Sequence, residues 1–176
     1  MIKLYGRCTE KEGLLWLINQ ARQRGLSPHD LVVKASALLG VANPLGIKLL
    51  VDQGLNTVNV TSDISLARLA GIRQVVSIPI DLYIESPDGL GGFTRYHEIA
   101  EIVRVAAPIY LKFGLRNAPN IYPSGVHLEQ VAVQTARERV RRASLGLEML
   151  ARSVQDFKTS QPGAPGLGVP VSPSSR

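Results

Sequence analysis

Residues 108–117 read PIYLKFGLRN, an alternating run that decides the fold. In an extended strand, successive side chains point to opposite faces of the sheet. The run therefore places its apolar side chains on one face and Tyr110, Lys112 and Arg116 on the other. We predict a strand with one face in a hydrophobic core and one face that carries polar groups.

Two earlier runs, at residues 55–61 and 78–85, show the same alternation. Their polar members are Thr57, Asn59, Thr61, Asp81, Tyr83 and Glu85. Their apolar members are branched aliphatic side chains, which favour strands. Three strands in series are thus expected to carry polar groups on one shared face.

Helical patterns separate these strands. We expect helices at residues 9–24, 43–53, 64–76, 99–107 and 126–157, and a buried strand at 30–40. The expected caps of the first three helices are Thr9, Asn43 with Pro44 after it, and Ser62 or Asp63. Alternating strands and helices are typical of α/β proteins with a parallel sheet. A polar interior face favours a barrel, because a doubly wound sheet is covered by helices on both faces and would be apolar.

The number of strands limits this barrel. A complete barrel has eight strands, and the sequence provides about four. The predicted fold class is therefore α/β, a half or shortened parallel (β/α) barrel with a long C-terminal helix. We expect one domain at residues 1–158 and a disordered tail at 159–176, because TSQPGAPGLGVPVSPSSR has few groups that could form a core.

Composition points to a globular intracellular protein. Of 176 residues, 45% are hydrophobic and 19% are charged, enough for an ordinary core. The single cysteine, Cys8, excludes a disulfide framework and fits a reducing cytoplasm. No run is apolar for long enough to span a membrane, and the N-terminus lacks a signal-peptide core. We expect a cytoplasmic location and no membrane partner.

The formal net charge of +6 raises the question of nucleic-acid binding. Much of the excess lies in one helical stretch that holds Arg137, Arg139, Arg141, Arg142 and Arg152. Glutamates at 129, 138 and 148 are interspersed with these arginines, as on a solvated, ion-paired helix face. We therefore do not expect a nucleic-acid partner.

The candidate site follows from the rule that barrel enzymes act at the carboxyl ends of their strands. We assign Lys112 and Glu85 as candidate catalytic residues, and Asn59, Thr61, Arg116 and Asn117 as candidate substrate-binding residues. A lysine on an inward strand position can serve as a base, a Schiff-base former or an electrophilic stabiliser. Glu85 on the neighbouring strand would be its acid or base partner.

Each assignment has a structural alternative. Glu85 and Lys112 could be a plain cross-strand ion pair, and Arg116 could hold a loop through Asp88 instead of binding an anion. The glycine-rich connection at 86–96 could be a flexible linker, or a lid that brings Arg95, Tyr96 and His97 to a ligand.

No metal site or cofactor motif is expected. The three histidines lack the HExxH spacing of zinc hydrolases, and the glycine-rich loop matches no phosphate-binding or dinucleotide fingerprint. A magnesium site built from Glu85, Asp63 and Asp88 stays open as an alternative, and the cofactor is unknown.

Two stretches carry a resemblance to a known family. They read NTVNVTSDISLARLAGIRQVVSIPIDLYIESPDGLGGF and IYLKFGLRNAPNIYPSG, within about residues 31–125. This part of the chain resembles the barrel half of the collagenase-like peptidase family of unassigned catalytic type. The resemblance implies a barrel and a peptidase-like hydrolase. The family's cysteine-containing signature is absent, since Cys8 lies outside the matched segment.

Two functions follow. The first is an enzyme or enzyme-derived barrel that acts on a small anionic or carbonyl-containing substrate, or on a peptide. The alternative is a non-catalytic binding or assembly protein that forms a homo-oligomer through the long C-terminal helix.

Overall fold

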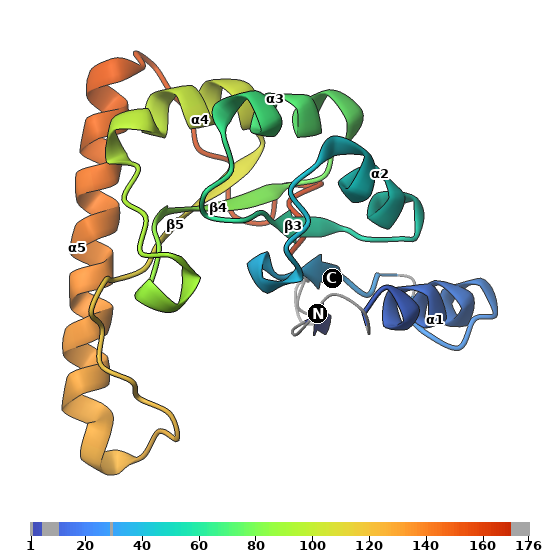
Figure 1. The fold of residues 1–176 in the computed structure, drawn as a ribbon, viewed down its shortest axis with the longest axis horizontal. Helices are drawn as coiled ribbons and strands as arrows, with labels where there is room; N and C mark the ends of the chain where they lie inside the picture. Colours follow the sequence, from blue (N-terminus) through green and yellow to red (C-terminus); the bar gives the residue numbers. More distant parts are fainter. Residues whose placement is uncertain (1, 5–10, 29, 170–176) are drawn as a thin grey trace.

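The computed structural model describes residues 2–4, 11–28 and 30–169, and these residues form an α/β fold (Figure 1). Five short strands form one sheet. They are β1 (Ile2–Leu4), β2 (Val33–Ala35), β3 (Thr57–Asn59), β4 (Ile80–Glu85) and β5 (Ile109–Phe113). Three of them lie within the three alternating runs, so the predicted alternation marks real strands.

The sheet has the order β1-β2-β3-β4-β5, and every neighbouring pair is parallel. Sequential parallel strands are the arrangement of consecutive units in a (β/α) barrel, and here β1 and β5 are the two edges of an open sheet. The expected half-barrel with a long C-terminal helix is thus confirmed. β1 lies outside the predicted strands and brings the number of strands in the described part of the chain to five.

The helices are α1 (Lys11–Gln23), α2 (Pro44–Asp52), α3 (Leu66–Val75), α4 (Ile99–Ala106) and α5 (Glu129–Ser153). Asn43 caps α2 as expected, because its side chain accepts a hydrogen bond from the Gly46 amide and Pro44 follows it. Thr9, the expected cap of α1, lies outside the described residues. Ser65 caps α3, where Ser62 or Asp63 was expected.

The predicted strand at 30–40 proved to be two elements. β2 is short, and a single 3₁₀ turn (Ala37–Leu39) follows it directly. The Ser36 side chain accepts a hydrogen bond from the Leu38 amide and so starts this turn, while Gly40 ends it with a φ of 71°. The apolar pattern identified the burial of this segment but not its turn.

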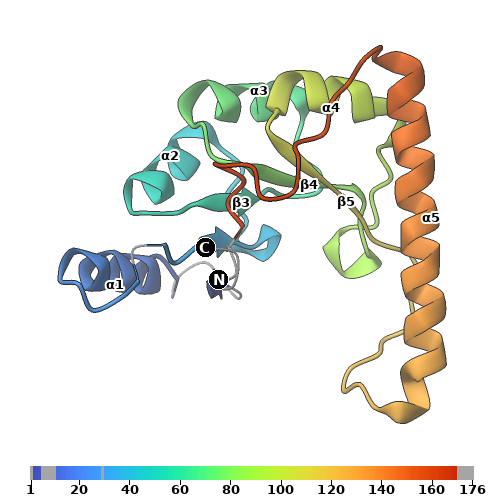
Figure 2. The same cartoon turned by 180° about the vertical axis from the view of Figure 1, so that it is seen from behind.

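One hydrophobic core lies between the sheet and the helices. The apolar side chains of β2, β3 and β4 all belong to it, together with side chains from each of the five helices. In Figures 1 and 2, α2, α3 and α4 run side by side over one face of the sheet. The polar side chains of the strands therefore lie on the opposite face, which we call the polar face.

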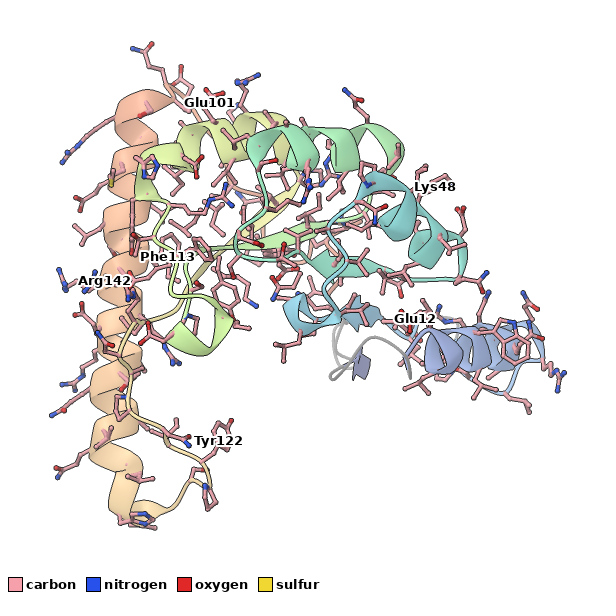
Figure 3. The ribbon with its side chains drawn as sticks, viewed as in Figure 1. Glu12, Lys48, Glu101, Phe113, Tyr122 and Arg142 are labelled. Carbon is pink, nitrogen blue, oxygen red and sulfur yellow. The ribbon has the colours of Figure 1, made fainter. Side chains whose placement is uncertain are left out.

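Helix α5 packs on the rest of the protein through its C-terminal part. Gly146 and Leu150 are the buried residues of this helix. A Cβ atom at Gly146 would overlap the Phe113 ring, so glycine lets α5 approach β5 closely. Figure 3 shows Phe113 beside α5 at the level of Arg142. The N-terminal part of α5 extends beyond the sheet, accompanied by the loop that carries Tyr122.

The segment after α5 returns to the sheet. The Tyr110 hydroxyl donates to the Leu167 carbonyl across 2.8 Å, and Figure 2 shows the segment passing in front of β3 and β4. Part of the segment that we expected to be disordered, at Leu167 and Gly168, therefore contacts the polar face. The rest of the expected tail, 170–176, lies outside the described residues.

One guanidinium connects two consecutive strand–helix units at the amino ends of their strands. Arg73 donates to the Ala106 carbonyl from two nitrogens (3.0 and 2.7 Å) and to the Val76, Ile78 and Pro108 carbonyls at 2.9–3.1 Å. Burial lowers the pKa of Arg73 from its usual value. Because Arg73 satisfies carbonyls at the ends of α3 and α4 and at the start of β5, it fixes how these units pack.

We expect Arg73→Met to lower the free energy of unfolding by about 2–4 kcal/mol, since it leaves several carbonyls without a donor. Urea unfolding monitored by circular dichroism measures this loss. Arg68→Met is the matched control, an exposed arginine on the same helix whose loss should change stability by less than about 0.5 kcal/mol. Equal effects of the two variants would contradict the role given to Arg73.

A second prediction uses two glycines in helices. Alanine has the higher helix propensity, by about 1 kcal/mol. Nothing lies within 4 Å of a Cβ placed at Gly13 in α1, so Gly13→Ala should stabilise the protein. Gly146→Ala should destabilise it by about 1–3 kcal/mol, because the methyl group forces α5 away from Phe113. Urea midpoints that shift in the same direction would contradict this account of the α5 contact.

Candidate functional site

The centre of the polar face is a buried carboxylate. Asp81 on β4 is 4% exposed. The Lys34 ammonium on β2 lies 2.6 Å from its Oδ1. The Thr57 hydroxyl on β3 shares its single proton between Asp81 Oδ2, at 3.2 Å, and the Pro79 carbonyl, at 3.0 Å. A buried charge requires such partners, so Asp81 holds three neighbouring strands in place.

Lys112 on β5 lies in the same polar face. It is opposite Tyr83 in the register, and Asp81 is opposite Tyr110, two residues earlier on β5. Its Nζ is 4.3 Å from the centroid of the Tyr83 ring and 3.0 Å from the Asn59 side-chain oxygen. The Asn59 nitrogen donates to the Asp81 carbonyl across 3.1 Å, and these two partners set the orientation of the amide. Of the predicted site residues, Lys112 and Asn59 are therefore brought together.

Glu85 lies in a different environment from the one expected. The register shifts between Tyr83, which is opposite Lys112, and Glu85, which is opposite Phe113. A bulge of this kind re-aims the side chains that follow it. The Glu85 carboxylate accepts from the Tyr96 hydroxyl at 2.8 Å and lies 3.5 Å from an Arg142 nitrogen on α5.

This contact network connects α5 to the end of β4. Burial, and then the Glu85 carboxylate, raise the pKa of Tyr96 above its usual value. The carboxylate of Glu138 pairs with Arg141 and Arg142, which lowers the pKa of Glu138 to about 2. In this structure, Glu85 therefore joins α5 to the sheet through Tyr96 and Arg142.

Arg116 and Asn117 follow β5 and hold the loop after β4. The Arg116 Nε donates to Asp88 Oδ1 across 3.1 Å, and the Asn117 amide donates to Asp88 Oδ2 across 2.7 Å. The Asn117 hydrogen bond and then the Arg116 hydrogen bond lower the pKa of Asp88. The structural alternative for Arg116, a loop contact with Asp88, is thus the arrangement observed.

Thr61 follows β3 in a tight turn, where its carbonyl accepts from the Ile64 amide across 3.3 Å.

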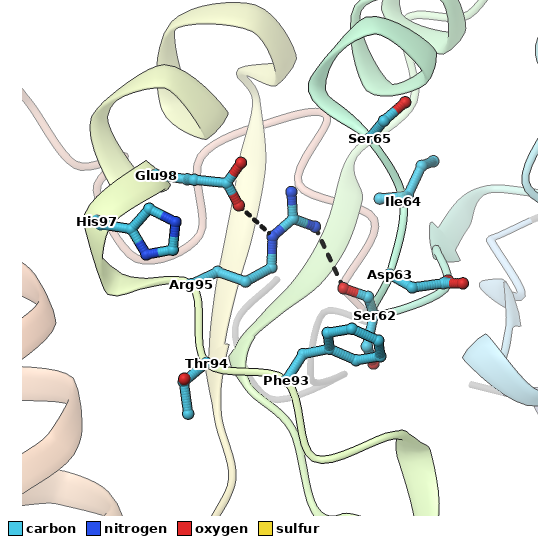
Figure 4. A pocket seen from close by; sticks show the side chains of 9 residues that line it. All are labelled: Ser62, Asp63, Ile64, Ser65, Phe93, Thr94, Arg95, His97 and Glu98. Carbon is cyan, nitrogen blue, oxygen red and sulfur yellow. Dashed lines mark hydrogen bonds and ion pairs between the residues drawn. The ribbon is translucent and has the colours of Figure 1, made fainter.

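A cavity of about 270 Å³ lies beside this turn, between the start of α3 and the glycine-rich connection (Figure 4). Arg95 lines the cavity and is 6% exposed. Its guanidinium donates to Glu98 Oε2 at 2.7 Å and to the Ser62 carbonyl at 3.2 Å.

The described part of the chain contains no cluster of three or more His, Cys, Asp or Glu side chains that could hold a metal ion. The magnesium alternative built from Glu85, Asp63 and Asp88 therefore has no support from their positions. None of the helices in the described part is long and apolar enough to cross a membrane.

Some residues of the polar face were not among the predicted site residues. Asp81 and Tyr83 belong to the alternating pattern of β4, but they precede the carboxyl end of the strand, where the candidates were sought. Lys34 stands out as a charge within a buried apolar run, which was a usable signal. Arg142 had no such signal, because its partner Glu85 is 57 positions away in the sequence.

No family model matches the chain, and no curated protein is similar to it. Among solved structures, the X-ray structure of the YdjI aldolase from Escherichia coli K12 shows a similarity at 17% sequence identity and a TM-score of 0.44. The alignment covers 86% of this chain and 58% of the aldolase. A TM-score of this size does not establish a shared fold or a shared reaction.

Proposed function

We propose that the protein is an enzyme, or a protein derived from one, that acts on a small anionic or carbonyl-containing substrate at the polar face. One observation supports this most directly: the Lys112 ammonium is held between the Tyr83 ring and the Asn59 amide. A lysine whose ammonium is held in a fixed position is suited to react with a carbonyl group or to stabilise a negative charge.

The neighbouring groups determine what this lysine can do. The Asn59 side-chain oxygen accepts a hydrogen bond from the Lys112 ammonium, so it orients the nitrogen without adding a charge. We infer that Lys112, once its ammonium has lost a proton, is the nucleophile for a carbonyl carbon.

The resemblance to collagenase-like peptidases extends the proposed substrate class to peptides. A peptide carbonyl could accept a hydrogen bond from the same ammonium. Peptidase-like hydrolysis stays a prediction, because it requires an activated water or nucleophile as well as a cation.

Reductive trapping tests the role of Lys112, with pyruvate as the probe. An amine condenses with a carbonyl and releases water, and borohydride reduces the resulting imine to a stable amine. Peptide mass mapping should find the adduct on Lys112 at several times the level found on Lys48, a half-exposed lysine of α2. Lys112→Met should abolish this selective adduct and leave the helical circular dichroism unchanged.

Lys48→Met is the matched control and should leave the adduct on Lys112 intact. An adduct distributed evenly over the surface lysines, or its absence from Lys112, would overturn the assignment of Lys112 as the reacting amine.

One observation favours the second function, assembly through α5. Val133, Val140 and Leu147 recur every seven residues, so they lie on one side of the helix. They are 44%, 67% and 42% exposed, respectively. An apolar stripe on a helix that extends beyond the sheet is suited to pairing with a second copy.

Sedimentation over a range of protein concentrations tests this assembly. The wild-type chain should form a dimer that Val140→Glu dissociates, because a carboxylate in the stripe would be buried without a partner. Gln134→Glu adds the same charge at an exposed position off the stripe and should leave the dimer intact. A monomer at every concentration would exclude assembly through α5.

A further inference from the structure

The C-terminal segment, residues 159–169, makes two specific contacts with the amino-terminal end of the polar face. The first is the hydrogen bond from the Tyr110 hydroxyl to the Leu167 carbonyl, at 2.8 Å. Tyr110 lies in the polar face, since it is opposite Asp81 in the register and the Lys34 ammonium is 5.8 Å from its ring centroid. Burial raises the pKa of the Tyr110 hydroxyl, which remains a donor at neutral pH.

The second contact is the close approach of Gly168. A Cβ atom at this position would lie 3.1 Å from the Thr57 Cβ, 3.4 Å from the Pro79 Cγ and 3.5 Å from the Asn56 carbonyl oxygen. The φ of Gly168 is +63°, a conformation that other residues adopt at a cost. The backbone at 168 therefore rests directly on the sheet, and its fit requires glycine.

The other glycines of the segment differ from Gly168 in one respect. Gly163 and Gly166 also have positive φ values, both +78°, but nothing lies within 4 Å of a Cβ at either position. Glycine is thus needed for the shape of the chain at these two positions, and for contact with the sheet only at Gly168.

The segment is held by few interactions. Within the described residues, the hydrogen bond to Leu167 is the one that joins the segment to a strand. A single hydrogen bond contributes little net stability, and apart from Leu167 and the half-exposed Val169 the segment has only small apolar side chains, which add little buried area. Thr57, which lies beneath Gly168, is nevertheless only 1% exposed. A weakly held segment that covers a buried polar surface can be exchanged for a similar one.

We propose that Tyr110, Thr57 and Pro79 form a binding site for an extended, glycine-containing peptide, and that residues 164–169 of the same chain are its resident ligand. We call this surface the segment site. Tyr110 recognises a backbone carbonyl by a hydrogen bond. Thr57 and Pro79 recognise the glycine that follows, because its backbone packs directly against them. The proposal concerns peptide binding alone and does not depend on the reaction proposed for Lys112.

Occupation of the segment site by residues 164–169 of the same chain has a measurable consequence. A peptide added from solution must compete with the attached segment, so its apparent affinity falls by the fraction of chains whose site is open. A substitution that detaches the resident segment should therefore strengthen binding of the added peptide.

Fluorescence anisotropy on the full-length chain tests the proposal, with a labelled peptide of residues 159–169, TSQPGAPGLGV, as the probe. In the chain, Gly168→Ala removes the fit to Thr57 and should tighten peptide binding about tenfold relative to wild type. Gly166→Ala is the matched control, because it imposes the same backbone strain without a contact to lose. Its peptide affinity should stay close to that of the wild type.

Two further variants test the recognition itself. Tyr110→Phe, combined with Gly168→Ala in the chain, should weaken peptide binding about fivefold through the lost hydrogen bond. The peptide carrying Gly168→Ala should bind no chain. Hydrogen exchange of residues 159–169 should rise in the Gly168→Ala chain and not in the Gly166→Ala chain, while the urea midpoint stays constant in both.

Absence of peptide binding to the Gly168→Ala chain would overturn the proposal. Equal affinities for the two alanine chains would assign the effect to backbone strain and overturn the segment site as well. If the peptide with alanine bound as tightly as the original, the requirement for glycine would be wrong.

Discussion

The buried carboxylate of Asp81 is the constraint on which the polar face depends. A carboxylate that is 4% exposed must be met by partners, and these come from the strands on one side of β4: Lys34 on β2 and Thr57 on β3. The Asp81 carbonyl accepts from Asn59, which in turn contacts Lys112 on β5. One residue thereby couples four strands of an open sheet, and the positions of the candidate site residues follow from that coupling.

The two faces of the sheet are stabilised in different ways. The helix-covered face is stabilised by buried aliphatic side chains, and its packing tolerates substitutions that conserve side-chain volume. The polar face is held by hydrogen bonds and an ion pair, where the loss of one partner leaves a buried charge. A substitution on the polar face therefore affects the positions of several strands, including those that carry the proposed site.

Much of the fold could be predicted, because alternation reports which face of a strand is buried. The runs around Lys112 and Asp81 gave the strands, and the Asn43–Pro44 pair gave a helix start. The orientation of Glu85 could not be predicted, because the register shift between Tyr83 and Glu85 redirects the side chain and leaves no mark in the alternation. The contact of residues 159–169 was missed for another reason: it is made by the backbone at Gly168, which a count of apolar side chains does not register.

Because of the hydrogen bonds made by Arg73, the connections at the two ends of the sheet differ in how freely their lengths can change. At the amino ends of the strands, one guanidinium binds carbonyls of the α3–β4 and α4–β5 connections, so these connections cannot change length independently. The connections at the carboxyl ends are longer and are joined by exposed pairs such as Asp88 and Arg116. Evolutionary insertions and engineered loops should thus be accepted at the carboxyl ends, where new ligand specificity would arise without loss of the scaffold.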